Sequence, residues 1–227
     1  LNNLEFRSLV LFRLGLPIYS RDEPCLYCER HRDRFGLHSL SCRNGDDRYK
    51  RHTVLRDLVF LLASQVLLSP KKEVPGLIPG TKKRPGDIVL PRWHESRAAA
   101  IDVTITNPLQ QTYISKTAEN GGFASMAAES AKIAKHSEDC ERNSIVFVPF
   151  AMECTGGFGP SASKVMSSIV MNTRNRTDEP PASVTAKIFQ KVSFALQKEI
   201  ARALCKRGEP VECSITDAQH FEEVVKM

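Results

Sequence analysis

The most restrictive feature of the sequence is a pair of β-prone segments within residues 84–106, RPGDIVL and AAAIDVTIT, separated by residues 91–97. In the second segment the apolar residues Ile101, Val103 and Ile105 alternate with polar ones. A period of two is typical of a strand with one packed face. Two such segments joined by a loop of this length predict an antiparallel hairpin, which any fold of this chain has to accommodate.

The hairpin places two acidic residues on neighbouring strands. Asp87 begins the first strand and Asp102 lies in the middle of the second, while Trp93 and His94 are expected at the tip. Two carboxylates that converge on a sheet repel each other unless a positive charge lies between them, and a divalent metal commonly supplies that charge. The alternative is that both acids are solvated on an exposed hairpin.

Length and composition limit the class of protein. The chain has 227 residues with 41% apolar residues, which suits one sizeable domain with an appendage or two small domains. No apolar run approaches the length of a membrane span. The net charge of +6 and the pI near 9.0 are compatible with a nucleic-acid partner. Because Leu1 is not an initiator methionine, we expect a piece of a longer chain.

The cysteines indicate a metal site rather than disulfides. There are seven, an odd number, and the first three form the pattern C-x2-C-x9-H-x3-C with Cys25, Cys28, His38 and Cys42. Both pairs have the spacing of zinc ligands, and four ligands close a structural site. The sequence therefore predicts a structural zinc ion here, with His31 as a possible substitute ligand. The alternative is a set of ordinary thiols beside an incidental histidine.

The hydrophobic pattern predicts an α/β fold. Helices are expected at 1–14, 47–69, 123–136, 160–170 and 184–204, and strands at 71–74, 87–90, 98–106 and 144–151. From residue 47 the order is helix, strand, strand, strand, helix, strand, which implies a mixed sheet covered by helices. The expected organisation is an N-terminal helix and zinc knuckle (1–46), a core (47–172), a linker and C-terminal helix (173–207) and a tail (208–227).

This order of elements and acids resembles the restriction-endonuclease-like, PD-(D/E)xK nuclease core. The motifs along the chain are CLYC…H…C, Arg51-His52-Thr53, KEVP, RPGDIVLP, AAAIDVTITNPL, Lys132-x2-Lys135-His136 and a later Gly-Gly turn. In this order they are similar to the endonuclease region that follows the reverse transcriptase in certain non-LTR retrotransposons, and the resemblance covers roughly residues 1–205.

The resemblance implies a metal-dependent DNA endonuclease that nicks target DNA. Asp87 and Asp102 would bind Mg²⁺, with a carbonyl such as that of Val103 completing the shell. A nearby lysine would orient or deprotonate the attacking water. Lys132 and Lys135, three residues apart on one helix, are the candidates, and Lys132 is preferred.

The resemblance also implies partners. Arg51 and His52 match a basic motif that contacts DNA, and Arg84 adds positive charge just before Asp87. The expected partners are DNA, the RNA of the element and an upstream reverse transcriptase domain in the parent chain, but no membrane. The expected location is intracellular, in the nucleus.

The sequence departs from the family pattern at two positions. Gly86 separates Pro85 from Asp87, and Thr104 stands where the family places its lysine, so that lysine must come from the helix instead. A second hypothesis is therefore a zinc-stabilised nucleic-acid-binding module that has lost catalysis. A third is a resolvase-like enzyme that cuts branched DNA with the same core.

Overall fold

The computed structural model describes residues 1–93 and 96–211 and divides the chain into two compact units. Of the described residues, the first unit contains 1–44 and 201–211, and the second contains those within Gly45–Ile200. His94, which was expected at the hairpin tip, and residues 212–227 of the expected tail lie outside the described residues.

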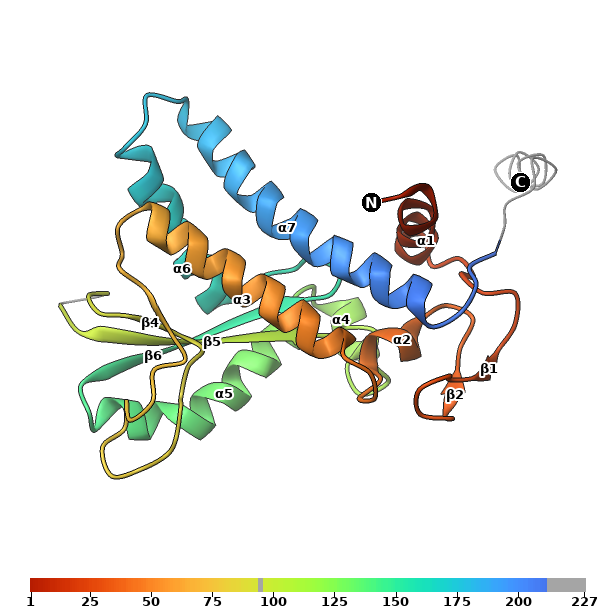
Figure 1. The fold of residues 1–227 in the computed structure, drawn as a ribbon, viewed down its shortest axis with the longest axis horizontal. Coiled ribbons are helices and arrows are strands. Elements are labelled where there is room, and N and C mark those ends of the chain that lie inside the picture. Colours follow the sequence, from red (N-terminus) through yellow and green to blue (C-terminus); the bar gives the residue numbers. More distant parts are fainter. Residues whose placement is uncertain (94–95, 212–227) are drawn as a thin grey trace. The chain divides into compact units, whose positions relative to one another are not determined.

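A four-stranded mixed sheet forms the centre of the second unit (Figure 1). Its strands, in the order β3-β4-β5-β6, are β3 (Lys71–Lys72), β4 (Ile88–Leu90), β5 (Ala98–Thr106) and β6 (Ile145–Glu153). β3 pairs with β4 and β4 with β5 in antiparallel fashion, whereas β5 and β6 are parallel. The predicted hairpin and the predicted α/β class with a mixed sheet are confirmed.

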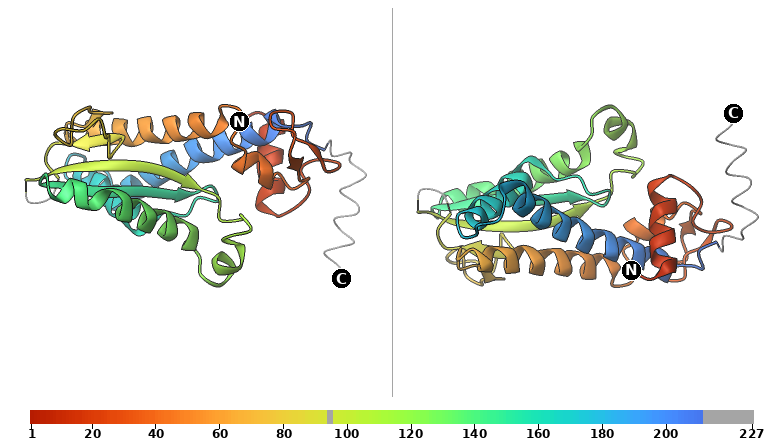
Figure 2. Two further views of the ribbon diagram at one scale, coloured as in Figure 1. Left: turned by 90° about the horizontal axis from the view of Figure 1, so that it is seen from below. Right: turned by 90° about the horizontal axis from the view of Figure 1, so that it is seen from above.

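Helices cover both faces of this sheet. α3 (Asp47–Gln65) lies on one face, and α5 (Phe123–Glu141), which connects β5 to the parallel strand β6, lies on the other (Figure 2). A short helix, α4 (Ile114–Glu119), precedes α5. α6 (Pro160–Arg174) contacts β6 and α3, and α7 (Pro181–Lys206) follows it.

The alternation in β5 produces the expected burial. Ile101 and Val103 are 1% and 2% exposed, whereas Asp102 between them remains partly exposed. β6 is buried along most of its length, as its nearly continuous apolar sequence predicts. Phe158, which follows β6, packs edge-on against Phe150 of β6 and against Phe189 of α7.

Two buried glutamates hold the starts of two helices. The carboxylate of Glu129, on α5, accepts hydrogen bonds from the backbone N–H groups of Ser161 and Ala162 in the first turn of α6. Glu153, at the end of β6, accepts one from Ser125 N in the first turn of α5. A carboxylate at a helix N-terminus satisfies unpaired N–H groups and interacts favourably with the helix dipole.

The first unit is small and built around short elements. It contains α1 (Asn3–Arg13), the antiparallel pair β1 (Glu23–Pro24) and β2 (His31–Arg32), and α2 (Leu37–Ser41). Asn2 and Glu5 form a reciprocal capping box at the start of α1. The hydroxyl of Tyr19, which is almost fully buried, donates a hydrogen bond to Leu204 O at 2.6 Å.

Across residues 1–93 and 96–211, no helix combines the length and the apolar character needed to cross a bilayer.

Candidate metal centre and carboxylate pair

The four predicted zinc ligands converge. Cys25 follows β1, Cys28 lies in the turn before β2, His38 is in α2 and Cys42 follows α2. Their donor atoms all lie within 4.8 Å of one another. Cys28 Sγ lies 3.3 Å from His38 Nε2 and 3.5 Å from Cys42 Sγ. Sulfur ligands on one tetrahedral zinc ion are separated by roughly 3.8 Å, so the quartet matches a structural zinc site.

Backbone hydrogen bonds explain how the local sequence builds this site. Cys25 N donates to Arg30 O, and Glu29 N donates to Cys25 O, which closes the turn that carries the first two thiols. The carboxylate of Asp33 accepts hydrogen bonds from Leu37 N at 3.0 Å and His38 N at 2.7 Å. These bonds fix the first turn of α2 and therefore the position of the His38 ring.

The electrostatics of the quartet favour a thiolate. Burial alone would raise the pKa of the Cys25 thiol, but the backbone N–H groups of Tyr27 and Cys28 and the His38 side chain lower it to about 6. Metal binding requires deprotonated thiols, so this environment suits a ligand. His31, the possible substitute, is exposed and lies 3.3 Å from Asp22, outside the quartet.

Asp87 lies immediately before β4 and is held by the backbone. Its own N–H donates to Ile101 O at 2.8 Å, so it extends the β4–β5 ladder by one step. The preceding Gly86 approaches β5 closely, because a Cβ atom at this position would lie 2.9 Å from backbone atoms of Ala100 and Ile101. This close approach explains why a glycine directly precedes Asp87 in this sequence.

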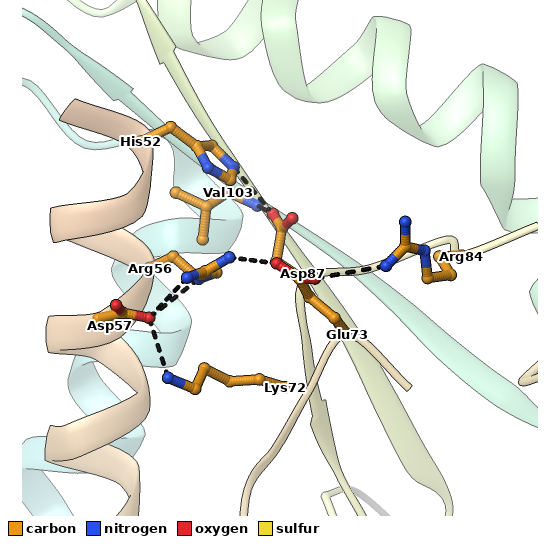
Figure 3. Close-up of polar contacts among 8 residues, drawn as sticks. All are labelled: His52, Arg56, Asp57, Lys72, Glu73, Arg84, Asp87 and Val103. Atoms are coloured by element: carbon orange, nitrogen blue, oxygen red, sulfur yellow. Dashed lines mark hydrogen bonds and ion pairs between the residues drawn. The ribbon is translucent and has the colours of Figure 1, made fainter. Parts of the chain in front are cut away.

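The carboxylate of Asp87 accepts two hydrogen bonds on the same oxygen (Figure 3). Oδ2 lies 3.1 Å from His52 Nε2 and 2.8 Å from the backbone nitrogen of Val103. Burial alone would raise the pKa of Asp87, but these two hydrogen bonds and the nearby charge of Lys132 lower it. The His52 pKa is raised, chiefly by its hydrogen bond to Asp87. Asp87 is therefore ionised near neutral pH.

Asp102 pairs with the predicted lysine. Its Oδ2 lies 2.7 Å from Nζ of Lys132, which is on α5. Burial raises the pKa of Asp102, and the negative charge of Asp87 raises it further, although Lys132 acts in the opposite direction. The influence of Asp87 and Lys132 on this pKa shows that all three charges belong to one electrostatic environment.

The second lysine candidate lies differently. Lys135 is exposed on α5. Burial lowers the pKa of His136, and the positive charges of Lys135 and Lys132 lower it further. The ring of His136 packs against Phe147, with the centroids 5.3 Å apart.

An ion-pair network lies beside Asp87 (Figure 3). Arg56 contacts both Asp57 and Glu73, Lys72 contacts Asp57 at 3.3 Å, and Arg84 contacts Glu73 at 3.3 Å. Asp57 and Glu73 are thus both paired with basic side chains. Arg56 is the least exposed member of this network.

The three residues expected to contact DNA have three different environments. Arg51 is buried, with 5% of its surface exposed, and therefore presents little surface to a phosphate. His52 is half-buried and bonded to Asp87. Arg84 is exposed and pairs with Glu73. Helix geometry accounts for the difference between the first two, because consecutive helical residues point about 100° apart.

Two contributors to these sites were not found from the sequence. Asp33 holds the His38 turn, and an acid shortly before a short helix is the only signal that could have indicated it. Arg207 donates to Cys25 Sγ at 3.6 Å, and no sequence pattern connects residues so far apart. Among residues 1–93 and 96–211, the Cys25 quartet is the only group of three or more potential metal ligands that converge.

Comparison with protein-family models, with curated protein sequences and with solved structures gives no match.

Proposed function

We propose that this chain is a metal-dependent DNA endonuclease with a restriction-endonuclease-like core that nicks target DNA. The observation that carries the proposal is the contact between Lys132 Nζ and Asp102 Oδ2, beside a second carboxylate, Asp87, on the neighbouring strand. A lysine beside two acids can orient or deprotonate water that a metal held by those acids activates, and this is the arrangement that the resemblance to PD-(D/E)xK nucleases implies.

The two carboxylates fit Mg²⁺ in donor type. Mg²⁺ is commonly held by one or two carboxylates and several waters, with substrate phosphates as further ligands, so a third protein carboxylate is not required. Because both hydrogen bonds to Asp87 end on Oδ2, Oδ1 is the oxygen available to a ligand on that side chain. Glu73 is committed to Arg56 and Arg84.

Each residue has a separate role in the proposed reaction. Asp87, ionised and held by His52 and Val103 N, supplies a fixed negative oxygen. Lys132 offsets the charge of Asp102 and orients the attacking water on the α5 side. A bound Mg²⁺ would activate that water and stabilise the charge that develops on the phosphate. The exposed Arg84 would contact the substrate backbone in this proposal.

The substrate in this proposal is DNA. The net charge of +6 favours a polyanion, and the phosphate backbone supplies most of the non-specific affinity of DNA-binding proteins. The proposal includes a nuclear location, element RNA and an adjoining reverse transcriptase as partners, all of which rest on the family resemblance of the motifs.

The experiment is a nicking assay on supercoiled plasmid with Mg²⁺. Wild-type protein should convert supercoiled to open circular DNA, and Asp87→Asn and Asp102→Asn should each slow this conversion by at least about 100-fold. Glu141→Gln, an exposed acid on α5 that pairs with Arg97, is the matched control and should retain the wild-type rate. Full activity in Asp102→Asn would reject the assignment of the site.

A second candidate is a zinc-stabilised nucleic-acid-binding module without catalysis. It is favoured by the partial burial of Asp102, which raises the pKa of this carboxyl and so disfavours the ionised form that binds a metal. This candidate predicts salt-sensitive DNA binding that is unchanged in the Asp87→Asn/Asp102→Asn double variant, and no cleavage with Mg²⁺ or Mn²⁺. A preference for cutting four-way junctions over linear duplex would instead indicate a resolvase-like enzyme.

A further inference from the structure

Arg207, directly after the end of α7, is fully buried in the first unit. A fully buried guanidinium is unusual, because desolvating this charge is costly unless it is paired and hydrogen-bonded. The groups around it therefore indicate what its charge does.

The guanidinium of Arg207 contacts the zinc quartet directly. Nη1 donates to Cys25 Sγ at 3.6 Å, and Nη2 donates to Asn44 O at 2.8 Å. Asn44 O also lies 3.5 Å from Cys42 Sγ, so the guanidinium connects two of the cysteine loops. Its planar face lies over the ring of Tyr27, with Cζ 4.8 Å from the centroid.

The backbone around Arg207 is fixed by other contacts in the same unit. Arg207 O accepts a hydrogen bond from Arg32 Nη1 at 2.9 Å. A Cβ atom on Gly208 would lie 1.6 Å from that same Arg32 nitrogen, so a side chain there would displace the Arg32 guanidinium. Val211 N donates to Ile18 O at 2.8 Å. The backbone contacts of Arg207 and the hydrogen bonds of its side chain thus both fix the position of the guanidinium.

The positive charge of Arg207 explains its contact with the Cys25 thiol. Zinc with three thiolates and one neutral imidazole would carry one net negative charge, and two of the four ligand residues, Cys25 and Cys42, are buried. An uncompensated buried charge is unfavourable. Groups that hydrogen-bond to metal ligands hold them in place, and their loss typically weakens metal affinity 10- to 100-fold.

We propose that Arg207 is a positioning residue of the zinc site, which neutralises the zinc–thiolate cluster and holds Cys25 Sγ through an N–H···S hydrogen bond. The chain after α7 is then part of the metal centre, and zinc retention depends on a residue far from the four ligands in sequence. This role is independent of nuclease activity.

The test measures zinc transfer from the full chain to a chromogenic chelator, together with the spectrum of the Co²⁺-substituted protein. Arg207→Met keeps the length of the side chain but loses its charge and donors, and it should release zinc about tenfold faster. In Arg207→Met the thiolate-to-Co²⁺ charge-transfer band should move to longer wavelength. The N–H···S bond of the wild type stabilises the sulfur lone pair that donates the electron, so loss of this bond lowers the transition energy. Arg207→Lys restores the charge and should release zinc within about threefold of wild type.

The matched control is Arg202→Met, which removes the same charge from an exposed position on the last turns of α7. It should match wild type in zinc release and in the Co²⁺ spectrum. The proposal is overturned if Arg207→Met behaves like this control, or if Arg207→Met and Arg207→Lys lose zinc equally fast. If Arg207→Met does not fold, Arg207→Lys alone is the test. Zinc release from Arg207→Lys about tenfold faster than from wild type, with an unshifted Co²⁺ band, would then reject the proposed role.

Discussion

Lys132 Nζ, on α5, lies 2.7 Å from Asp102 Oδ2. Thr104, two residues after Asp102 on β5, has no charged group, so the helix supplies the cation that this strand lacks. The parallel arrangement of β5 and β6 places the connecting helix α5 against this strand. The position of the lysine is therefore a consequence of the crossover topology.

Replacing Lys132 separates the two lysine candidates. If the proposed mechanism holds, Lys132→Met should slow single-turnover nicking by about 100-fold, because it removes the group assigned to orient the attacking water. Lys135→Met should stay within about threefold, because Lys135 is exposed and, among the residues that the structure describes, no ion pair joins it to Asp87 or Asp102. The reverse ranking would assign the catalytic role to Lys135.

His52 should affect metal dependence rather than DNA affinity. His52→Ala removes the donor 3.1 Å from Asp87 Oδ2, so the carboxylate is less well positioned and nicking should require several-fold more Mg²⁺ for half its maximal rate. Plasmid binding without added Mg²⁺ should be unchanged. His52→Gln, which can retain an N–H donor, should recover part of the effect. Weakened binding with unchanged Mg²⁺ dependence would instead support direct contact between His52 and DNA.

Gly86 should not tolerate a side chain. Gly86→Ala places a methyl group 2.9 Å from the backbone of β5 and should lower the free energy of unfolding by about 1–3 kcal/mol. Gly121→Ala is the matched control, since its Cβ would meet no atom within 4 Å. Urea denaturation measures both. Equal stability of the two variants would show that the strands separate without cost at this point.

The buried cap on α6 should contribute measurably to stability. Glu129→Gln removes the charge that interacts with the first turn of α6 and should cost about 1–2 kcal/mol in free energy of unfolding. Glu138→Gln, on an exposed position of the same helix, should cost much less, because its ion pair with Arg142 is solvated. Urea denaturation distinguishes the two, and a loss in Glu138→Gln as large as that in Glu129→Gln would contradict the assignment.

Zinc removal should change the reactivity of three thiols only. With metal bound, Cys25, Cys28 and Cys42 should resist alkylation, and a chelator should make them react. Cys140 is fully buried and its pKa is raised to about 11, chiefly by burial, so it should stay unmodified at pH 8 until the protein unfolds. Peptide mass spectrometry reads each site in a Cys213→Ser background. Rapid alkylation of the three thiols in zinc-loaded protein would reject the metal site.

Local patterns in the sequence were sufficient for the strands of the main sheet, for the long helices and for one of the two sites, but not for the short elements β1, β2 and α2. The period of two in residues 101–105 predicted β5, and the spacing of Cys25, Cys28, His38 and Cys42 predicted a converging quartet. Both signals are short-range, because a strand face and a ligand pair depend on residues a few positions apart. The mixed sheet followed from the order of elements, because a helix between the third and fourth strands allows a parallel connection.

The parts that could not be predicted depend on contacts between distant residues. Nothing near Arg207 indicates that its guanidinium reaches Cys25, and nothing near Glu129 indicates that it caps α6. A basic pair at a helix start suggested two phosphate contacts, yet Arg51 points inward and His52 meets Asp87. Polar residues at such positions have their roles set by tertiary packing, which periodicity does not encode.

The hydrogen bonds of Asp87 have an entropic consequence. Its backbone N–H and its carboxylate both bond to β5, at Ile101 O and Val103 N, so pairing of the strands restricts the side-chain rotamer. The conformational entropy of that carboxylate is therefore lost when the protein folds rather than when a ligand arrives. A cation that binds the Asp87 carboxylate would therefore meet a group that is already ordered. Its binding free energy would not include the cost of ordering that side chain.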